Sequence, residues 1–327
     1  MDYIKQPGIK NPLSKEEIKY YTSKLEDRYT IGEQIGVSSA KTSTYLLHHE
    51  SGLPFVLKTP NDKKNTQWID NQISQEKIRS HYLLGYEGDV VSPDMVELGR
   101  YYTVEPYCGE PLLAKTYDYT LSNDIKEKIA YDLGTFLNFL HQQKPQNKIG
   151  NLEICSPTSA YSLNEIFTYF KPHLSLEENK EWEKRIESFI NRDTSDEVAA
   201  LTHGNICSQT VLYNPQTQNI AIIDWETFRS RAVYRDFAPT TSFDLSYHLL
   251  EKMTTAYNTD EKETDIKINL QKLFLFHMLT SYQEIGTRAI ENECKNQPFN
   301  EPVQNILHRH IAPIEHAKQK LFERTLS

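Results

Sequence analysis

Residues 201–213 read LTHGNICSQTVLY, and residues 220–226 read IAIIDWE. Together they predict a loop that enters a tight hairpin at about 210–223, because two short β-branched and apolar runs flank a polar turn. The isoleucines of the second run would bury that strand, so Asp224 follows at its rigid end. Taken alone, Asp224 is best interpreted as a turn-forming residue at the end of a strand.

Elements on the N-terminal side of this hairpin are mostly strands. Short β-branched and aromatic runs predict strands at Tyr29–Ile35, Thr44–His48, Pro54–Lys58, Val96–Leu98 and Tyr101–Val104. Pro106 has no N–H to give a strand ladder and should end the last of them. A helix is expected near 66–84, with Ile69, Ile73, Ile78 and Leu83 among its apolar positions.

Beyond residue 120 the period of the apolar residues changes from two to 3.6. Asp124–Gln142 carries one apolar stripe, and Ser122 or Asn123 can cap its start. Residues 161–191 and 241–325 also read as mostly helical. The expected fold class is therefore α+β, with a sheet-rich first third and a helical remainder.

Further motifs occur in order along the chain. Lys58 ends a strand and Glu76 lies in the following helix. Residues 133–141 read LGTFLNFLH, and residues 236–238 read DFA, twelve residues after Asp224. With the loop at 201–213, this order resembles the aminoglycoside phosphotransferases and choline kinases, relatives of the protein kinases, whose loop reads His-Gly-Asp, then Asn five residues later, then Ile-Asp-Trp-Glu. The resemblance covers residues from about 30 to 250.

This resemblance implies a two-lobed kinase-like fold. Residues 1–27 would form an N-terminal helical extension, 28–107 a small β-rich lobe with one main helix, and 108–327 a larger, mostly helical lobe that contains the catalytic-loop hairpin. The cofactors implied are ATP and Mg²⁺, held between the lobes.

The resemblance also implies roles for single residues. Lys58 would neutralise the α- and β-phosphates, and Glu76 would hold its ammonium. Asp224 would act in catalysis by ligating Mg²⁺, because this hard cation prefers carboxylate oxygens. Glu105 and Tyr107 belong to the segment whose backbone would read adenine. The remaining expected nucleotide contacts come from a loop that would fold over the phosphates, with Gly36, Ser38 and Ser39.

Other family positions imply a structural role. The loop histidine, His203, would pack beneath the catalytic turn, and Asp236 would anchor the backbone of that turn from a following helix. His141 is interpreted as a core residue. His203 also has a plain alternative, which is that of a buried histidine with its hydrogen bonds satisfied.

Two positions depart from the family pattern. Asn205 stands where the family has the catalytic aspartate, and an amide is no base at neutral pH. Thr210 stands where the family has a metal-ligating asparagine, and its hydroxyl would bind a cation only weakly. An engineered change would explain Asn205, but a second departure in the same loop favours a natural pair.

These departures separate nucleotide binding from turnover. General-base help is worth about 10²- to 10⁴-fold in rate, whereas phosphoryl transfer depends mainly on positioning and charge neutralisation. The sequence therefore predicts ATP and Mg²⁺ binding, with weak or altered phosphotransfer to an unknown hydroxyl-bearing acceptor. The alternative is an inactive pseudokinase that binds a protein partner.

Composition excludes other classes of protein. The chain has 327 residues, with 36 Lys and Arg against 45 Asp and Glu, for a net charge of −9. This acidity argues against nucleic acid as a partner. The four cysteines form no Cys-x-x-Cys pair, and no stretch approaches the length of a membrane span. The sequence thus predicts a cytoplasmic protein, although an export signal read by a receptor would be invisible here.

Overall fold

The structure is a computed structural model. It describes residues 23, 25, 28–38, 42–60, 67–112, 121–143, 162–191, 199–207, 210–237, 247–259 and 268–270. Between 272 and 290 it describes only separate helical positions. The expected helical extension at 1–27 lies almost wholly outside these residues, as does the end of the last expected helical region.

The chain divides into two compact units. Unit 1 comprises Met1–Pro111 and Val211–Glu226, and unit 2 comprises Leu112–Thr210 and Thr227–Ser327. The hairpin expected in the C-terminal lobe thus groups with the N-terminal part of the chain. The lobe boundaries derived from the sequence stay a prediction.

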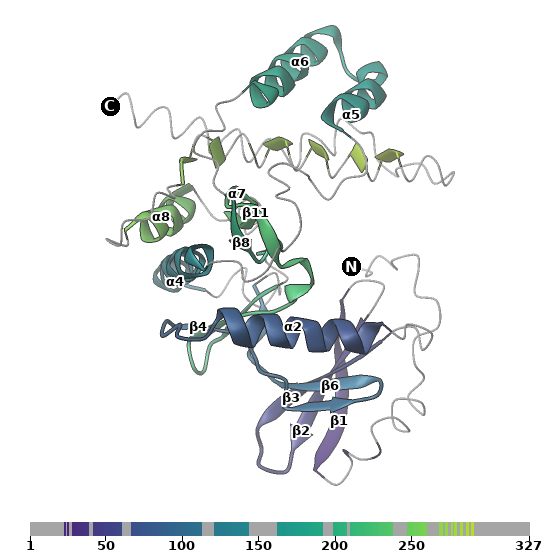
Figure 1. Ribbon diagram of the computed structural model, residues 1–327, viewed down its shortest axis with the longest axis vertical. Coiled ribbons are helices and arrows are strands. Elements are labelled where there is room, and N and C mark those ends of the chain that lie inside the picture. The colour runs from purple at the N-terminus through teal and green to yellow at the C-terminus, as the bar shows by residue number, and fades with distance from the viewer. Residues whose placement is uncertain are drawn as a thin grey trace. The chain divides into compact units, whose positions relative to one another are not determined.

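A five-stranded antiparallel sheet forms much of unit 1 (Figure 1). Its order is β1-β2-β3-β6-β5, from the strands Tyr29–Ser38, Thr42–His49, Pro54–Pro60, Tyr102–Pro106 and Glu97–Gly99. Alternate positions of these strands point into one apolar cluster, which includes Leu47, Leu57 and Val104. The five predicted strands are confirmed, and Pro106 ends β6 as expected.

A second sheet of unit 1 contains the predicted hairpin. Its order is β4-β10-β9-β7, from Val90–Val91, Asn219–Ile222, Val211–Asn214 and Glu110–Pro111. β9 and β10 pair antiparallel, with Asn219 opposite Asn214. Gly109 has φ of +116°, and a Cβ there would lie 2.2 Å from the Tyr213 carbonyl oxygen, so only glycine lets β7 approach β9 this closely.

Helix α2, Trp68–Tyr82, confirms the helix expected near 66–84. Its buried positions differ from an ordinary apolar stripe. The isoleucines at 69, 73 and 78 are only half-buried, whereas the polar Gln72 and Arg79 are buried beside Trp68 and Tyr82. The Trp68 indole N–H donates to Thr42 Oγ1 at 3.1 Å and ties the start of α2 to β2.

In unit 2, helix α4 (Asn123–Gln142) packs against α8 (Tyr247–Asn258). The Ser122 side chain caps α4, as predicted. Helices α5 (Leu163–Phe170) and α6 (Leu176–Ile190) follow, joined by the 3-10 turn η2 (Lys171–His173), and each begins with a Ser/Glu capping box. Strands β8 (Ala199–Thr202) and β11 (Arg229–Ala232) pair antiparallel, and α7 spans Tyr234–Phe237.

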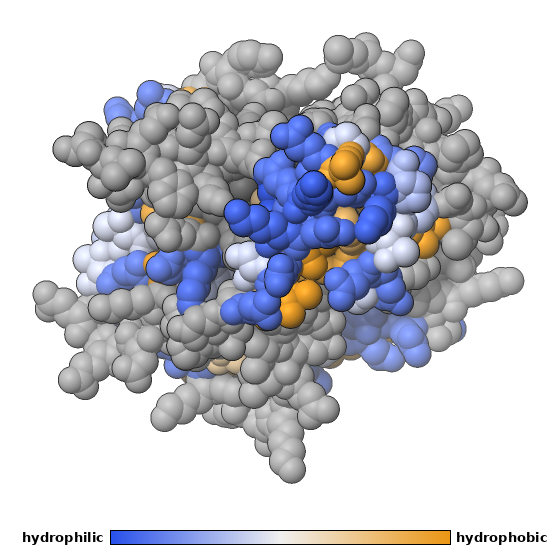
Figure 2. Space-filling view, turned by 90° about the horizontal axis from the view of Figure 1, so that it is seen from above, coloured by the Kyte–Doolittle hydropathy of each residue, from blue (hydrophilic) through white to orange (hydrophobic). Residues whose placement is uncertain are grey.

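The fold thus combines antiparallel sheets with helices, and the α+β prediction is confirmed. Figure 2 shows one face of the molecule on which most of the coloured residues are hydrophilic, interrupted by small hydrophobic groups. Among the residues that the structure describes, no helix has both the length and the apolar character needed to cross a membrane.

Candidate functional site

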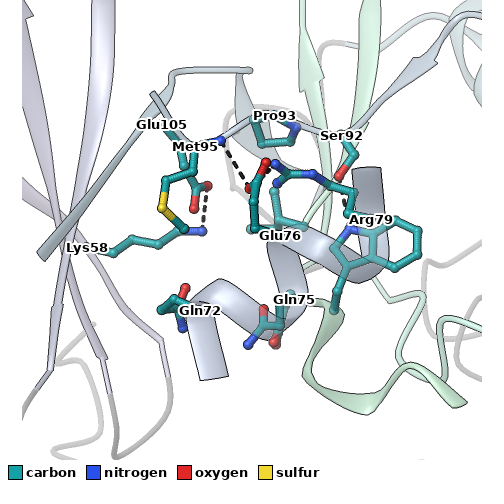
Figure 3. Close-up of a pocket in the computed structure, with 12 residues that line it drawn as sticks. Lys58, Gln72, Gln75, Glu76, Arg79, Ser92, Pro93, Met95 and Glu105 are labelled. Atoms are coloured by element: carbon teal, nitrogen blue, oxygen red, sulfur yellow. Dashed lines mark hydrogen bonds and ion pairs between the residues drawn. The ribbon is translucent and has the colours of Figure 1, made fainter. Parts of the chain in front are cut away.

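A polar pocket lies within unit 1 (Figure 3). It is lined from β3, α2, β6, the segment after β4 and the turn after β10. Its lining residues are Lys58, Gln72, Gln75, Glu76, Arg79, Ser92, Pro93, Met95, Glu105, Ile223, Asp224 and Trp225. Four residues predicted from the sequence, Lys58, Glu76, Glu105 and Asp224, are therefore brought to one pocket.

The lysine of this pocket pairs with a carboxylate from the neighbouring strand. Lys58 on β3 lies opposite Thr103 on β6, and Glu105 follows two residues later on the same face of the sheet. Lys58 Nζ donates to Glu105 Oε2 at 2.7 Å, and the two side chains are 19 % and 8 % exposed. The expected contact of Glu105 was through its backbone, whereas the structure directs its side chain into the pocket.

Glu76 makes other contacts. Its carboxylate forms an ion pair with Arg79, accepts the backbone N–H of Met95 at 3.2 Å and accepts the Ser80 hydroxyl at 3.3 Å. The Lys58–Glu76 ion pair expected from the sequence is wrong for this structure. Its physical reason is competition, because the guanidinium three residues along the same helix reaches Glu76 and Glu105 reaches the lysine.

Asp224 follows β10 at a strained position. Its φ is +68°, in the left-handed region that only a few non-glycine residues adopt, with aspartate among those that tolerate it. Ser92 fixes the chain on either side, since it donates to the Ile222 carbonyl oxygen at 3.1 Å and accepts the Trp225 indole N–H at 3.0 Å. The Asp224 side chain is exposed and lines the pocket.

The donor set of the pocket fits a magnesium ion that is carried with phosphate. Its lining holds three carboxylates, from Glu76, Glu105 and Asp224, against the cations Lys58 and Arg79. Within the described part of the chain, no group of three or more His, Cys, Asp and Glu side chains could enclose a metal. Mg²⁺ is commonly bound through one or two carboxylates plus substrate phosphates, so a single carboxylate such as that of Asp224 would be enough to hold it beside a phosphate.

Other expected nucleotide contacts lie elsewhere or are not described. Tyr107 does not line the pocket, and its N–H already donates to the Pro54 carbonyl oxygen at 3.2 Å. Gly36 and Ser38 lie in β1, where Gly36 is opposite Thr44 and Ser38 is opposite Thr42 on β2. Ser39 lies outside the described residues. The roles of these four residues stay predictions.

One cysteine lies close to the ion pair. Burial raises the pKa of the Cys108 thiol to about 11, and the negative charge of Glu105 adds to this effect while Lys58 opposes it. The thiol donates to the Pro106 carbonyl oxygen at 3.5 Å. Cys108 is therefore protonated and poorly nucleophilic at neutral pH.

The predicted catalytic turn lies in unit 2 and is anchored by a buried carboxylate. Asp236 accepts the backbone N–H groups of His203 at 2.8 Å and Gly204 at 2.5 Å. His141 Nε2 lies 3.0 Å from the same carboxylate, and His141 Nδ1 lies 2.9 Å from the Tyr257 hydroxyl. His141, His203 and Asp236 are fully or almost fully buried. Their predicted structural roles are confirmed.

The two departures from the family pattern lie in this turn. The Thr210 hydroxyl donates to the Asn205 carbonyl oxygen at 2.5 Å and accepts the Cys207 N–H at 3.0 Å. Thr210 is also buried. These contacts favour a role in holding the turn over the predicted role as a cation ligand. The Asn205 side chain is half-buried and records no hydrogen bond to another described residue.

Unit 2 also carries a groove of about 290 Å³ between α5 and α6. Its lining combines an apolar floor with carboxylates and amides, from Asn164, Phe167, Glu183, Ile186, Glu187, Ile190 and Asn191. Lys171 already places its ammonium 3.1 Å from Glu183 and 5.6 Å from the centre of the Phe167 ring. Of the two carboxylates in the lining, Glu183 therefore already has a cationic partner.

Sequence reasoning missed the Arg79 contact and the side-chain role of Glu105. The spacing of Glu76 and Arg79, three residues apart on a helix, was a readable signal for an ion pair. The contact of Glu105 with Lys58 had no such signal, because it depends on the register between two strands that are 47 residues apart in the chain.

Comparisons with known proteins identify the family of this chain. The model of the phosphotransferase enzyme family matches residues 33–264. A search of curated proteins gave no significant match.

Solved structures with similar folds include the GDP and kanamycin complex of APH(2")-IIia, with a TM-score of 0.58 and 16 % identity over 92 % of this chain and 99 % of that one. The streptomycin–ATP–APH(2")-IIa ternary complex gives 0.55 and 14 % over 94 % and 96 %. Choline kinase LicA from Streptococcus pneumoniae gives 0.54 and 15 % over 92 % and 96 %. These likenesses show that the chain has the predicted kinase-like fold.

Proposed function

This chain belongs to the phosphotransferase enzyme family, and from that premise we propose that it binds ATP with Mg²⁺ and transfers a phosphoryl group, at a low or altered rate, to a hydroxyl of a small-molecule acceptor. The observation that carries the proposal is that Lys58 and Asp224 line one pocket. An ammonium and an exposed carboxylate are the two groups that a magnesium-bound triphosphate requires.

The residues of the pocket would divide the work of binding. Lys58 donates hydrogen bonds to phosphate oxygens and offsets their charge. Asp224 holds the cation that accompanies the phosphates, and this cation supplies charge neutralisation during transfer. The strained backbone at Asp224, fixed through Ser92, keeps the carboxylate directed without reorganisation.

Asn205 limits the rate in this proposal. Its amide orients an acceptor hydroxyl by hydrogen bonding but takes no proton from it. The missing general base costs about 10²- to 10⁴-fold in turnover, while the electrostatic contributions of Lys58 and Asp224 remain. The chain should therefore bind ATP with an affinity that its low turnover would not suggest.

Restoring the carboxylate tests this proposal. Asn205→Asp should raise ATP turnover by about 10²-fold or more, measured as phosphate or ADP release. A second variant combines Asn205→Asp with Thr210→Asn. The threonine is not replaced alone, because its hydroxyl holds the turn and the loss of that hydroxyl would disturb the loop. Asn219→Asp, an exposed change at the start of β10, is the control and should leave turnover unchanged. Flat turnover in both restored variants would contradict the proposed site.

The acceptor is proposed to be cationic. Two similar structures contain the aminoglycosides kanamycin and streptomycin, and a third is a choline kinase. The groove between α5 and α6 is lined by the Glu187 carboxylate together with Phe167 and Ile186, which suits an amine attached to an apolar skeleton.

Binding of such acceptors tests the groove directly. Glu187→Gln should weaken kanamycin or choline binding by about 5-fold or more, since one charge-assisted contact is lost. Glu177→Gln, in the first turn of the same helix but outside the groove lining, should bind like wild type. Equal weakening in both variants would indicate a general effect of net charge and would contradict the assignment of the groove.

The alternative of an inactive, protein-binding pseudokinase gains no support from the comparisons or from the described residues. A cytoplasmic location and the absence of nucleic-acid partners stay predictions.

A further inference from the structure

We propose that Glu105, and not Glu76, is the carboxylate that positions Lys58 for the nucleotide. Glu105 is thus a positioning residue, which acts through the lysine. This inference rests on the proposed function, because the role of Lys58 toward phosphate is part of that proposal. The pairing itself is a property of the nucleotide-free chain and can be tested without any nucleotide.

The geometry of the sheet carries the first step. Lys58 and Glu105 project from adjacent antiparallel strands onto the same face, and their charged atoms lie 2.7 Å apart. Both side chains are largely buried, at 19 % and 8 % exposure. A carboxylate this deeply buried needs a partner, since an uncompensated buried charge is strongly destabilising. The lysine therefore has a fixed position set by the sheet.

The second step is that Glu76 is committed elsewhere. Its carboxylate pairs with Arg79 and accepts the N–H of Met95, which anchors α2 to the segment before β5 (Figure 3). Arg79 is itself buried and bridges to Asp94 at 3.2 Å. Release of Glu76 toward Lys58 would leave a buried guanidinium short of a partner and a backbone N–H without its acceptor.

The third step is that the pair leaves the lysine able to bind phosphate. An ammonium has three N–H donors, and the contact with Glu105 uses one of them. Its other N–H donors are therefore available to phosphate oxygens in the pocket that Lys58 lines. Lys58 is thus held by Glu105 across the sheet, and Glu76 is held by Arg79 within the helix.

Chemical labelling of the nucleotide-free protein tests the pair. Brief acylation with acetic anhydride, read by mass spectrometry at Lys58, should be about 2-fold faster or more in Glu105→Gln, because the Lys58 nitrogen must lose a proton and its contact with the carboxylate before its lone pair can attack the anhydride and release acetate. Glu76→Gln should leave labelling of Lys58 at the wild-type rate. Faster labelling in Glu76→Gln but not in Glu105→Gln would overturn the inference, whatever the nucleotide does.

Kinetics then test the positioning role. Glu105→Gln should lower kcat by about 10-fold or more through misorientation of the lysine. The Kd for ATP with Mg²⁺ should change by less than about 3-fold, because the lost orientation and the lost carboxylate–phosphate repulsion oppose each other. In a Lys58→Met background, Glu105→Gln should have little further effect on kcat, because the contact between the two side chains is already lost. Glu105→Asp should restore part of the turnover.

The matched control is Glu97→Gln. This change removes an ion pair of similar length but greater exposure, with Arg28 at 2.6 Å, from the neighbouring strand β5 and outside the pocket lining. It should alter neither the labelling of Lys58 nor the kinetics. Faster labelling of Lys58 in Glu105→Gln with unchanged kcat would overturn the positioning role. A wild-type chain that binds no ATP would contradict the proposed function and remove that role with it, while the labelling would still report on the pair.

Discussion

At the scale of single residues, Asp236 holds the turn at His203 and Gly204 by accepting two backbone N–H groups and contacting His141. Asp236→Asn replaces one acceptor oxygen by an amide nitrogen, so a buried donor loses its partner. We expect the free energy of unfolding in urea to fall by about 2–4 kcal/mol. Glu181→Gln, which removes an exposed ion pair with Arg185, should change it by less than about 1 kcal/mol. Similar losses in the two variants would contradict the anchoring role.

A second residue-scale prediction concerns Cys108, whose pKa is raised to about 11 by burial and then by Glu105. A raised pKa in the folded state favours folding below the ordinary pKa of 9.0, and this contribution disappears as the pH rises to about 11. Iodoacetamide alkylation of Cys108, followed by mass spectrometry, should therefore reach half its maximal rate well above pH 9. A midpoint at or below pH 9 would contradict the buried environment of the thiol.

At the scale of the helices and strands, the contact of α4 with α8 depends on Gly134. A Cβ at this position would lie 2.2 Å from the Met253 carbonyl oxygen and 2.9 Å from Ala256 Cβ. We expect Gly134→Ala to destabilise the protein by about 1–3 kcal/mol in thermal melting, even though alanine is the better helix former by about 1 kcal/mol. Thr135→Ala, at the exposed neighbouring position, is the control. A stabilised Gly134→Ala variant would contradict this close packing.

These elements also show how far the sequence predicts the structure. Helix α4 and the hairpin β9–β10 were predictable, because their periodicity and turn residues are local signals. The pairing of Lys58 with Glu105 was not, because it depends on the register between β3 and β6. Such contacts are set by tertiary packing, which a single sequence does not display.

At the scale of the whole molecule, unit 1 is discontinuous in the sequence. Strands β4 and β7 find their partners in β10 and β9, which arrive from residues 211–226. A fragment that ends at Pro111 loses this hairpin together with the buried Tyr213 and Ile220.

We expect the 1–111 fragment to lack a cooperative thermal transition by circular dichroism, and a version with residues 211–226 joined by a flexible linker to regain one. Cooperative melting of the fragment without the hairpin would contradict the division of the chain into these two units.

The central claim is that Lys58 and Asp224 serve one nucleotide pocket, and calorimetric titration of ATP with and without Mg²⁺ tests it most directly. Because the pocket lining carries three carboxylates against two cations, the wild-type chain should bind ATP far more tightly with Mg²⁺ than without it. Lys58→Met should weaken binding by about 10-fold or more, and Asp224→Asn should remove most of the Mg²⁺ dependence. Glu97→Gln should match wild type. Affinity and Mg²⁺ dependence that survive unchanged in both Lys58→Met and Asp224→Asn would contradict the account.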